Sequence, residues 1–275
     1  MGVTELVRPE HLARLKRLRL MDDDFMTKCF EDAPECVELV LRIVLEIPDL
    51  TVIEARTQAA MANLINRSVR LDILAEDSAG RRINVEVQRS DKGAGRKRAR
   101  FHSSMIDAGL LDRGDDFESL PETYVVFITE RDVIGRGEAV YRFDRCDLRT
   151  GESFGDGAHI VYVNGAFRDQ SPVGWLMHDF FCADPAQMYY ETLAKLTYYF
   201  KEGEGVSKMC RAFEELLEEG MERGLKKGRE EGLKKGQINT ARKLLELGKL
   251  ALEEIAACSD LSLEEVEQLR ASMSQ

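Results

Sequence analysis

Arg70-Leu71-Asp72-Ile73-Leu74 and, after a short turn, Ile83-Asn84-Val85-Glu86-Val87-Gln88 are the two stretches that decide the fold. Apolar and polar residues alternate in both, which is the period of half-buried strands, and Gly80 suits the turn between them. A hairpin folded about Ala79 places apolar residues opposite apolar residues, pairing Leu71 with Val87, Ile73 with Val85 and Ala75 with Ile83. We therefore predict two adjacent antiparallel strands with one wholly apolar face turned to the core.

The other face of this hairpin carries two acidic residues. The same register puts Asp72 opposite Glu86, at a Cβ separation of roughly 4.5–5.5 Å, where like charges are destabilising. A divalent cation between them removes that cost, since Mg²⁺ is commonly held by one or two carboxylates with water and phosphate. Two interpretations remain open on pattern alone: a metal site, or acids on a solvated face that Arg70 or Arg82 neutralises.

The order of an aspartate, a turn and then Glu-x-Gln resembles the core motif of the PD-(D/E)XK nuclease superfamily, in which Glu-x-Lys is usual. Within it, the sequence looks most similar to the recombination-promoting nuclease and transposase-like family, whose members often carry Glu-x-Gln. The similarity extends to Asp24–Phe30, Arg98–Asp107 and Leu120–Ile128. The resemblance implies an α/β fold, with a restriction-endonuclease-like mixed central sheet flanked by helices.

The same resemblance implies a metal-dependent site. Asp72 and Glu86 would be metal ligands, the carbonyl of Val87 a third, and Mg²⁺, Mn²⁺ or Ca²⁺ the ion. Members of the superfamily often add an acid from the first helix, for which Asp24 is our preferred candidate. The alternatives to it are Asp22, Asp23, Glu31 and Glu54. Gln88 stands where a lysine is usual, and its amide can orient water but cannot supply charge or act as a base.

Residues 81–100 form a basic strip next to the two acids. Eight basic residues against two acids give this strip a net charge of +6, whereas the whole chain carries −11 and the remainder therefore −17. The contrast favours local binding of a phosphate backbone over a generally basic surface. The alternative is the solvated start of a charged helix. The predicted DNA-binding residues are Arg89, Lys92, Arg96, Lys97, Arg98 and Arg100.

Helical and strand patterns continue on both sides of the hairpin. Apolar spacing predicts a helix over 22–47, ended by Pro48, and another over 96–111. The inward residues of the second helix are predicted to be Phe101, Met105, Ile106 and Leu110. The apolar run Thr123–Thr129 suits a buried central strand, and further short strands are expected at 139–143 and 159–163. Residues 172–203 have an aromatic-rich helical pattern, which we assign to packing.

The C-terminal part differs in kind. Glycine recurs every fourth residue from Gly220 to Gly236, between charges at i,i+4 spacing that favour a solvated helix. Each glycine costs a helix roughly 0.5–1 kcal/mol, so we expect a second helix to pack on this stripe, or else a partly helical linker. Beyond it, Ser262 and Glu265 predict a capping box. This end resembles a helix-turn-helix, but its glutamates repel phosphate, which favours a protein contact or a folding cap.

Composition limits the class and location of the protein. The six cysteines are scattered without a Cys-x-x-Cys pair, which indicates a reduced, cytoplasmic protein without a disulfide framework or zinc site. No apolar run approaches the ~20 residues of a membrane span, so no membrane partner is expected. The N-terminus is polar and basic, unlike a signal peptide.

These patterns predict three parts: a nuclease-like domain over 1–205, a glycine-periodic charged helical arm over 206–240, and a small helical unit over 241–275. The predicted function is a metal-dependent DNA endonuclease of the recombination or mobile-element type that self-associates through the arm. The alternative is a catalytically degenerate, oligomeric DNA-binding or scaffold protein, which Gln88 and the acidic total charge favour. A nuclease that acts on RNA is a third possibility.

Overall fold

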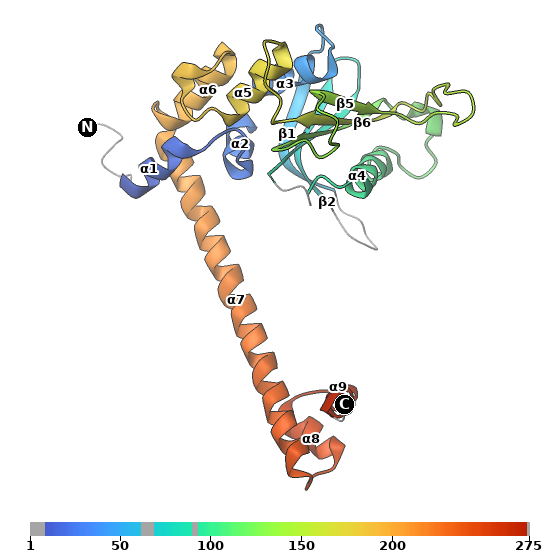
Figure 1. Ribbon diagram of the computed structural model, residues 1–275, viewed down its shortest axis with the longest axis vertical. Helices are drawn as coiled ribbons and strands as arrows, with labels where there is room; N and C mark the ends of the chain where they lie inside the picture. The colour runs from blue at the N-terminus through green and yellow to red at the C-terminus, as the bar shows by residue number, and fades with distance from the viewer. Residues whose placement is uncertain (1–8, 62–68, 90–92, 274–275) are drawn as a thin grey trace. The chain divides into compact units, whose positions relative to one another are not determined.

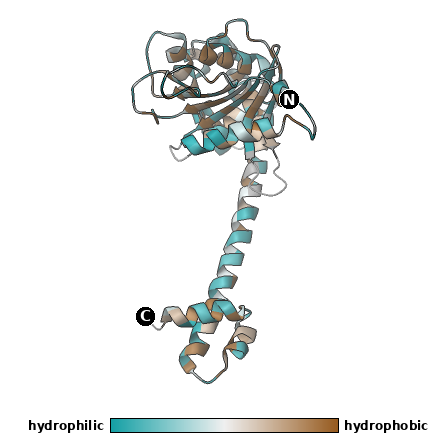
Figure 2. Cartoon of the chain, turned by 90° about the vertical axis from the view of Figure 1, so that its right-hand side faces the viewer, coloured by the Kyte–Doolittle hydropathy of each residue, from teal (hydrophilic) through white to brown (hydrophobic). Residues whose placement is uncertain are grey.

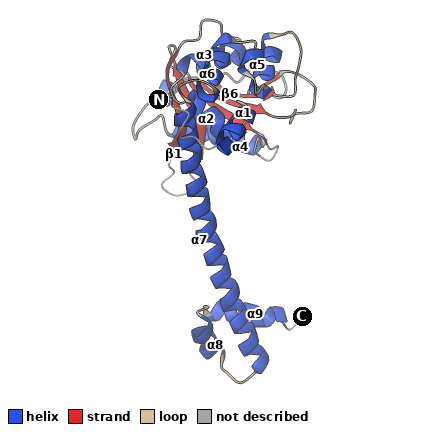
Figure 3. Cartoon of the chain, turned by 90° about the vertical axis from the view of Figure 1, so that its left-hand side faces the viewer, coloured by secondary structure: helices blue, strands red, loops and turns tan. Residues whose placement is uncertain are grey.

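A computed structural model describes residues 9–61, 69–89 and 93–273 of the chain. Internal contacts divide the chain into two units, Met1–Cys210 and Arg211–Gln275. The first unit contains a mixed sheet with helices on both faces, and the second contains helices (Figures 1 and 3). None of the helices in the described ranges is long and apolar enough to cross a membrane.

The sheet of the first unit has the strand order β1-β2-β3-β4-β6-β5. Strands β1 to β3 are antiparallel neighbours, β3, β4 and β6 run parallel, and β5 pairs with β6 in antiparallel fashion. The sheet is therefore mixed, as predicted, and β3 and β4 lie at its centre. The strands are β1 (Val52–Met61), β2 (Val69–Asp77), β3 (Arg82–Gln88), β4 (Thr123–Thr129), β5 (Val140–Phe143) and β6 (Ala158–Asn164).

The predicted hairpin is β2 and β3, and its register is confirmed for the positions nearest the turn. Ile73 pairs with Val85, Leu74 with Asn84 and Ala75 with Ile83. Gly80 has a φ of +80°, a conformation that L side chains rarely adopt. Asp77, fully buried, accepts hydrogen bonds from the backbone N–H groups of Ala79 and Arg81 and so fixes the turn.

One face of the sheet is covered by α2 (Asp23–Phe30), α3 (Pro34–Leu45) and α5 (Pro172–Phe181) (Figure 1). The single helix predicted over 22–47 is wrong, because the helix breaks at 31–33 and Pro34 begins a new one. Proline lacks an N–H and clashes inside a helix, but it fits the first turn. Side chains of α2, α3 and α5 meet Ile73, Val85 and Val87 around one small apolar cavity.

The opposite face is covered by α4 (Arg96–Ala108). Met105 and Ile106 are buried there against Val125, Phe127 and Tyr162, as the pattern predicted for this helix. Phe101 is exposed, so its predicted inward position is wrong, and the adjacent His102 takes the buried place instead.

Leu71 belongs to this α4 cluster rather than to the opposite face, which corrects the prediction that it faces the same way as Ile73. Its partner on β1, Ala59, follows Gln58, whose φ is +53°. Both Ala59 and Leu71 pack under α4, and the pairing of β1 with β2 keeps one register on both sides of Gln58.

The remaining helices of the first unit are α1 (Pro9–Arg17) and α6 (Glu191–Lys201). The helical pattern over 172–203 therefore divides into α5 and α6, separated by a short 3₁₀ turn at Pro185–Gln187. Lys201 is buried at the end of α6, where its ammonium group donates to the backbone carbonyls of Lys16, Leu18 and Ala183. This side chain joins three segments that are distant in sequence.

Helix α7 runs from Val206 to Leu247, and α8 (Leu252–Ser259) and α9 (Leu263–Met273) follow it. The predicted helical C-terminal tail is therefore confirmed, and its helix extends seven residues beyond 240. Hydrophilic colouring predominates along the middle of α7 (Figure 2). A small core of Ala241, Ile255, Leu261 and Val266 holds the second unit together. The capping box is confirmed: Ser262 Oγ accepts from Glu265 N–H at 3.2 Å, and the Glu265 carboxylate accepts from Ser262 N–H at 2.9 Å.

Candidate active site between β2 and β3

Asp72 and Glu86 lie on neighbouring antiparallel strands, and both are buried, with 7% of Asp72 and none of Glu86 exposed. In the described part of the sheet, backbone pairing of β2 with β3 ends at Ile73 and Val85, one position before the two acids. The acids therefore occupy the place where the strands part.

The two carboxylates bond to the backbone of the opposite strand. Val87 N–H donates to Asp72 Oδ2 at 3.0 Å, and Asp72 N–H donates to Glu86 Oε1 at 3.3 Å. Side chains thus replace the backbone ladder at this point, which fixes both carboxylates between the strands.

The backbone pattern also orients the carbonyl of Val87. Gln88 turns its carbonyl toward β4, where it accepts from Glu130 N–H at 3.0 Å. Successive residues of a strand alternate in direction, and the N–H and C=O of one residue point to the same side. Because the N–H of Val87 points to Asp72, its carbonyl lies on the β2 side, with the two acids.

Helix α4 places a cation against Glu86. Arg98 Nη2 donates to Glu86 Oε2 at 2.9 Å, and Arg98 Nε donates to His102 Nε2 at 3.2 Å. His102 Nδ1 lies 3.5 Å from Glu86 Oε1, and Asn84 Nδ2 donates to the same carboxylate oxygen at 3.3 Å. Gln88 Nε2 reaches Glu86 Oε2 at 3.5 Å. Glu86 is therefore surrounded by polar side chains from β3 and α4.

The electrostatics of the pair are unfavourable. Burial, together with the charges of Glu86 and Asp23, raises the pKa of the Asp72 carboxyl to about 8, against the opposing effects of the Val87 N–H and Arg98. A buried carboxyl beside a second acid holds its proton near neutral pH. Arg98 contacts Glu86 but leaves the pKa of Asp72 raised, and a bound divalent cation would supply further positive charge.

Among the candidates for a further acidic ligand, Asp23 is the one whose charge acts on Asp72. Desolvation raises the pKa of the Asp23 carboxyl, and the charges of Asp24 and Glu86 add to this effect. Our preferred candidate, Asp24, lies beside it in the same turn of α2, and both residues are exposed. Among the alternatives, Asp22 pairs with Arg19 and Arg89, Glu31 with Lys28 and Glu54 with Arg56.

The predicted DNA-binding residues divide into three groups. Arg96, Lys97 and Arg100 are exposed at the start of α4, and they form no ion pair with any described residue. Arg89 pairs with Asp22 at 3.0 Å, and Arg98 pairs with Glu86. Lys92 lies outside the described residues.

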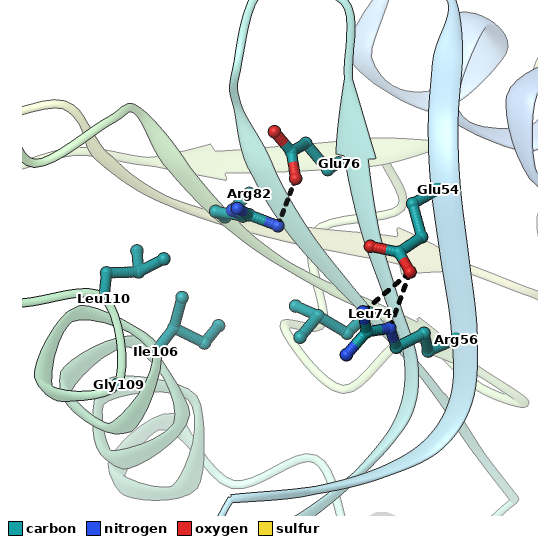
Figure 4. Close-up of a pocket in the computed structure, with 8 residues that line it drawn as sticks. All are labelled: Glu54, Arg56, Leu74, Glu76, Arg82, Ile106, Gly109 and Leu110. Atoms are coloured by element: carbon teal, nitrogen blue, oxygen red, sulfur yellow. Dashed lines mark hydrogen bonds and ion pairs between the residues drawn. The ribbon is translucent and has the colours of Figure 1, made fainter.

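An open cleft of about 270 Å³ lies on the α4 side of the hairpin, toward its turn (Figure 4). Its charges are already paired, with Arg56 at 2.7 Å from Glu54 and Arg82 at 2.5 Å from Glu76. Arg82 therefore does not neutralise the acidic pair, and the two acids do not line this cleft. Its lining residues are Glu54, Arg56, Leu74, Glu76, Arg82, Ile106, Gly109 and Leu110.

The described residues contain no group of three or more His, Cys, Asp or Glu side chains with the spacing of a metal site. The donors that the chain offers are the two carboxylates of Asp72 and Glu86 together with the carbonyl of Val87. This all-oxygen set fits Mg²⁺, which is usually held by one or two carboxylates and keeps several waters.

Sequence reasoning did not identify the roles of Asn84 and His102. One face of β3 carries every second residue, Asn84, Glu86 and Gln88, and one face of α4 carries Arg98 and His102, four residues apart. Both spacings can be read from the sequence. What the sequence could not provide was the packing of α4 over β3.

Residues 40–165 match the family model described as PD-(D/E)XK nuclease family transposase. The match covers all the strands described above, α4 and the two acids, and it begins after α2. Comparisons with curated proteins and with solved structures found no match. The mixed sheet, the acidic pair where β2 and β3 part and this match lead to one conclusion: residues 40–165 resemble the PD-(D/E)XK nuclease family transposases in fold and in motif.

Proposed function

We propose that the chain is a divalent-metal-dependent DNA endonuclease of the recombination or mobile-element type. The observation that carries this proposal is the buried pair Asp72 and Glu86, held between separating strands by opposing backbone N–H groups. Burying two carboxylates side by side is unfavourable for folding alone. Their placement is explained if they bind a cation.

Asp72, Glu86 and the Val87 carbonyl would hold the ion, with Mg²⁺ as the physiological choice and Mn²⁺ or Ca²⁺ as substitutes. A divalent cation, when bound, supplies the charge that lowers the pKa of water and neutralises the phosphate and leaving oxygen. As the first-helix acid we propose Asp23 in place of the adjacent Asp24, because its charge acts on Asp72. Gln88, near Glu86, would orient water through its amide.

DNA would lie along the start of α4. Arg96, Lys97 and Arg100 are exposed there, where no acidic side chain occupies the first turn of the helix. The N-terminus of a helix attracts phosphate through its free N–H groups and its dipole. Arg89, whose side chain is half exposed, extends this basic strip from the end of β3, and we place Lys92 in it from its sequence position alone.

We also propose that the arm, residues 206–240, binds a second copy of the chain. Leu217, Met221, Leu225 and Leu233 are exposed along α7, next to glycines that have no heavy atom of another residue near their Cβ positions. Residues 211–222 carry a net charge of −4 and residues 223–235 a net charge of +4. An antiparallel copy would bring unlike halves together and bury the apolar row.

The runner-up is a catalytically degenerate DNA-binding or scaffold protein that works mainly through this arm. Gln88 in place of lysine and the net charge of −11 favour it. The absence of a Cys-x-x-Cys pair supports a reducing, cytoplasmic location under either proposal.

Nicking of supercoiled plasmid tests the leading proposal. We expect cleavage with Mg²⁺ or Mn²⁺ and none with excess EDTA. Asp72→Ala and Glu86→Ala should reduce cleavage to background because each removes a ligand, and Gln88→Ala should slow it. Glu76→Ala is the matched control, since Glu76 lies on the same strand but pairs with Arg82. Undiminished cleavage by Asp72→Ala, or in EDTA, would exclude the mechanism.

A further inference from the structure

The acidic pair lacks the positive charge that a lysine gives to the usual Glu-x-Lys motif. Gln88 occupies the lysine position, and its neutral amide nitrogen lies 3.5 Å from Glu86 Oε2. The scissile phosphate gains negative charge during hydrolysis, and preorganised donors at that place contribute most of the catalytic effect in many enzymes. A nuclease with Gln88 therefore needs its cation from another segment.

Arg98 reaches the same carboxylate oxygen from α4. Its Nη2 lies 2.9 Å from Glu86 Oε2, the oxygen that Gln88 also approaches. Arg89 pairs with Asp22, and Arg96, Lys97 and Arg100 contact neither acid. Among the cationic side chains that the structure describes, Arg98 is the one in contact with the acidic pair.

The guanidinium of Arg98 is held in a fixed orientation. Nε donates to buried His102 at 3.2 Å, and Nη1 donates to the Gly93 carbonyl at 3.2 Å. A guanidinium carries five N–H donors, so two remain without a partner among the described residues. The side chain is 40% exposed, which leaves these donors open to a ligand. Two N–H groups of one planar guanidinium match the oxygens of a phosphate.

We propose that Arg98 takes the place of the missing lysine: it binds the scissile phosphate and also holds Glu86 in position when no divalent cation is present. This role rests on the proposed nuclease function. His102 and Gly93 act through Arg98, as they orient its guanidinium, and are therefore positioning groups.

Moving the positive charge from Arg98 to position 88 tests the catalytic role of Arg98. Arg98→Gln should lower kcat for plasmid nicking roughly 100-fold, the scale of losing one transition-state donor, with little change in KM. Adding Gln88→Lys to Arg98→Gln returns a cation to the motif and should restore at least tenfold of that loss. Arg113→Gln removes one exposed arginine elsewhere and is the charge-matched control. Unchanged kcat in Arg98→Gln, or no restoration in the double variant, would overturn the catalytic role.

A second measurement needs no DNA. Calorimetric titration of the full chain with Mn²⁺ should show severalfold tighter binding to Arg98→Gln than to wild type, because the guanidinium no longer competes for Glu86. Glu86→Gln should bind more weakly than wild type. Equal or weaker Mn²⁺ binding by Arg98→Gln would refute the proposal that Arg98 competes with the metal ion for Glu86. If wild type does not nick DNA, the nuclease proposal and the catalytic role fail together, and the titration alone decides the role at Glu86.

Discussion

The carboxyl of Asp72 contributes a pH dependence to the stability of the protein. Its pKa is raised from 3.8 to about 8 by burial and by Glu86 and Asp23. The folded protein thus binds this proton more tightly than the unfolded chain, and folding becomes less favourable as pH rises between these two values. The direction is opposite to that of a carboxylate stabilised by an ion pair.

Asp72→Asn should therefore raise the Tm of the metal-free protein at pH 8, by roughly 2–4 °C for each kcal/mol of relieved repulsion. The gain should shrink as pH falls toward 4, because the wild-type carboxyl is then protonated in the folded state. Thermal unfolding followed by circular dichroism at several pH values measures it. Asp112→Asn, at an exposed site, is the control, and a gain that does not vary with pH would refute the assignment to titration of Asp72.

The residue-level predictions that succeeded depended on local periodicity. The register of β2 and β3 follows from apolar residues at every second position, because a shift by one residue would turn each of them to the wrong face. The contacts of Arg98 and His102 with Glu86 join residues from two segments. No spacing within one segment encodes such a contact, so the sequence identified Arg98 only as one of the predicted DNA-binding residues of the basic strip.

Among the secondary-structure elements, the buried strand β4 was predicted at its observed bounds, whereas the helices before it were merged. An uninterrupted apolar strand has one place in such a sheet, its centre. Apolar spacing alone does not show where one amphipathic helix ends and the next begins. A proline such as Pro34 can follow the end of one helix or occupy the first turn of the next. The sequence does not distinguish these two positions, whereas the path of the chain does.

Lys201 connects the end of helix α6 to two other segments of the first unit. We expect Lys201→Met to destabilise this unit by roughly 2–4 kcal/mol. The methionine keeps most of the apolar volume but leaves the carbonyls of Lys16, Leu18 and Ala183 without their donor. Chemical denaturation measures the loss. Lys195→Met on the same helix removes an exposed ion pair with Glu191 and should have no measurable effect. Equal stability of the two variants would mean that water replaces the ammonium group.

For the whole molecule, the boundary between the two units lies after Cys210, and both Met209 and Cys210 are buried. A truncated chain that tests self-association should therefore end at Cys210 rather than at Gly205, so that the first unit keeps its packing. The glycine period indicated the arm, but the sequence did not show where packing against the first unit stops.

Light scattering should give a dimer for the full chain and a monomer for the chain ending at Cys210. Replacing Leu217, Met221, Leu225 and Leu233 by glutamine should give a monomer as well, since it removes the exposed apolar row. Gly224→Ala and Gly228→Ala should increase the helicity of the arm, because alanine favours helix by roughly 0.8–1.0 kcal/mol per residue, yet weaken the dimer if a partner helix contacts the stripe. An identical mass for the full and truncated chains would contradict self-association through the arm.

The bond from Val87 N–H to Asp72 makes one amide proton a spectroscopic probe of the site. Most amides of β3 report only on the sheet, whereas this one is bonded to a titrating carboxyl. In a ¹⁵N-labelled sample its chemical shift should follow the ionisation of Asp72 near pH 8 and should change again when diamagnetic Mg²⁺ or Ca²⁺ is added. Asp72→Asn should abolish the pH response. Ligand occupancy and proton release can thus be followed at one backbone position, without DNA and without turnover.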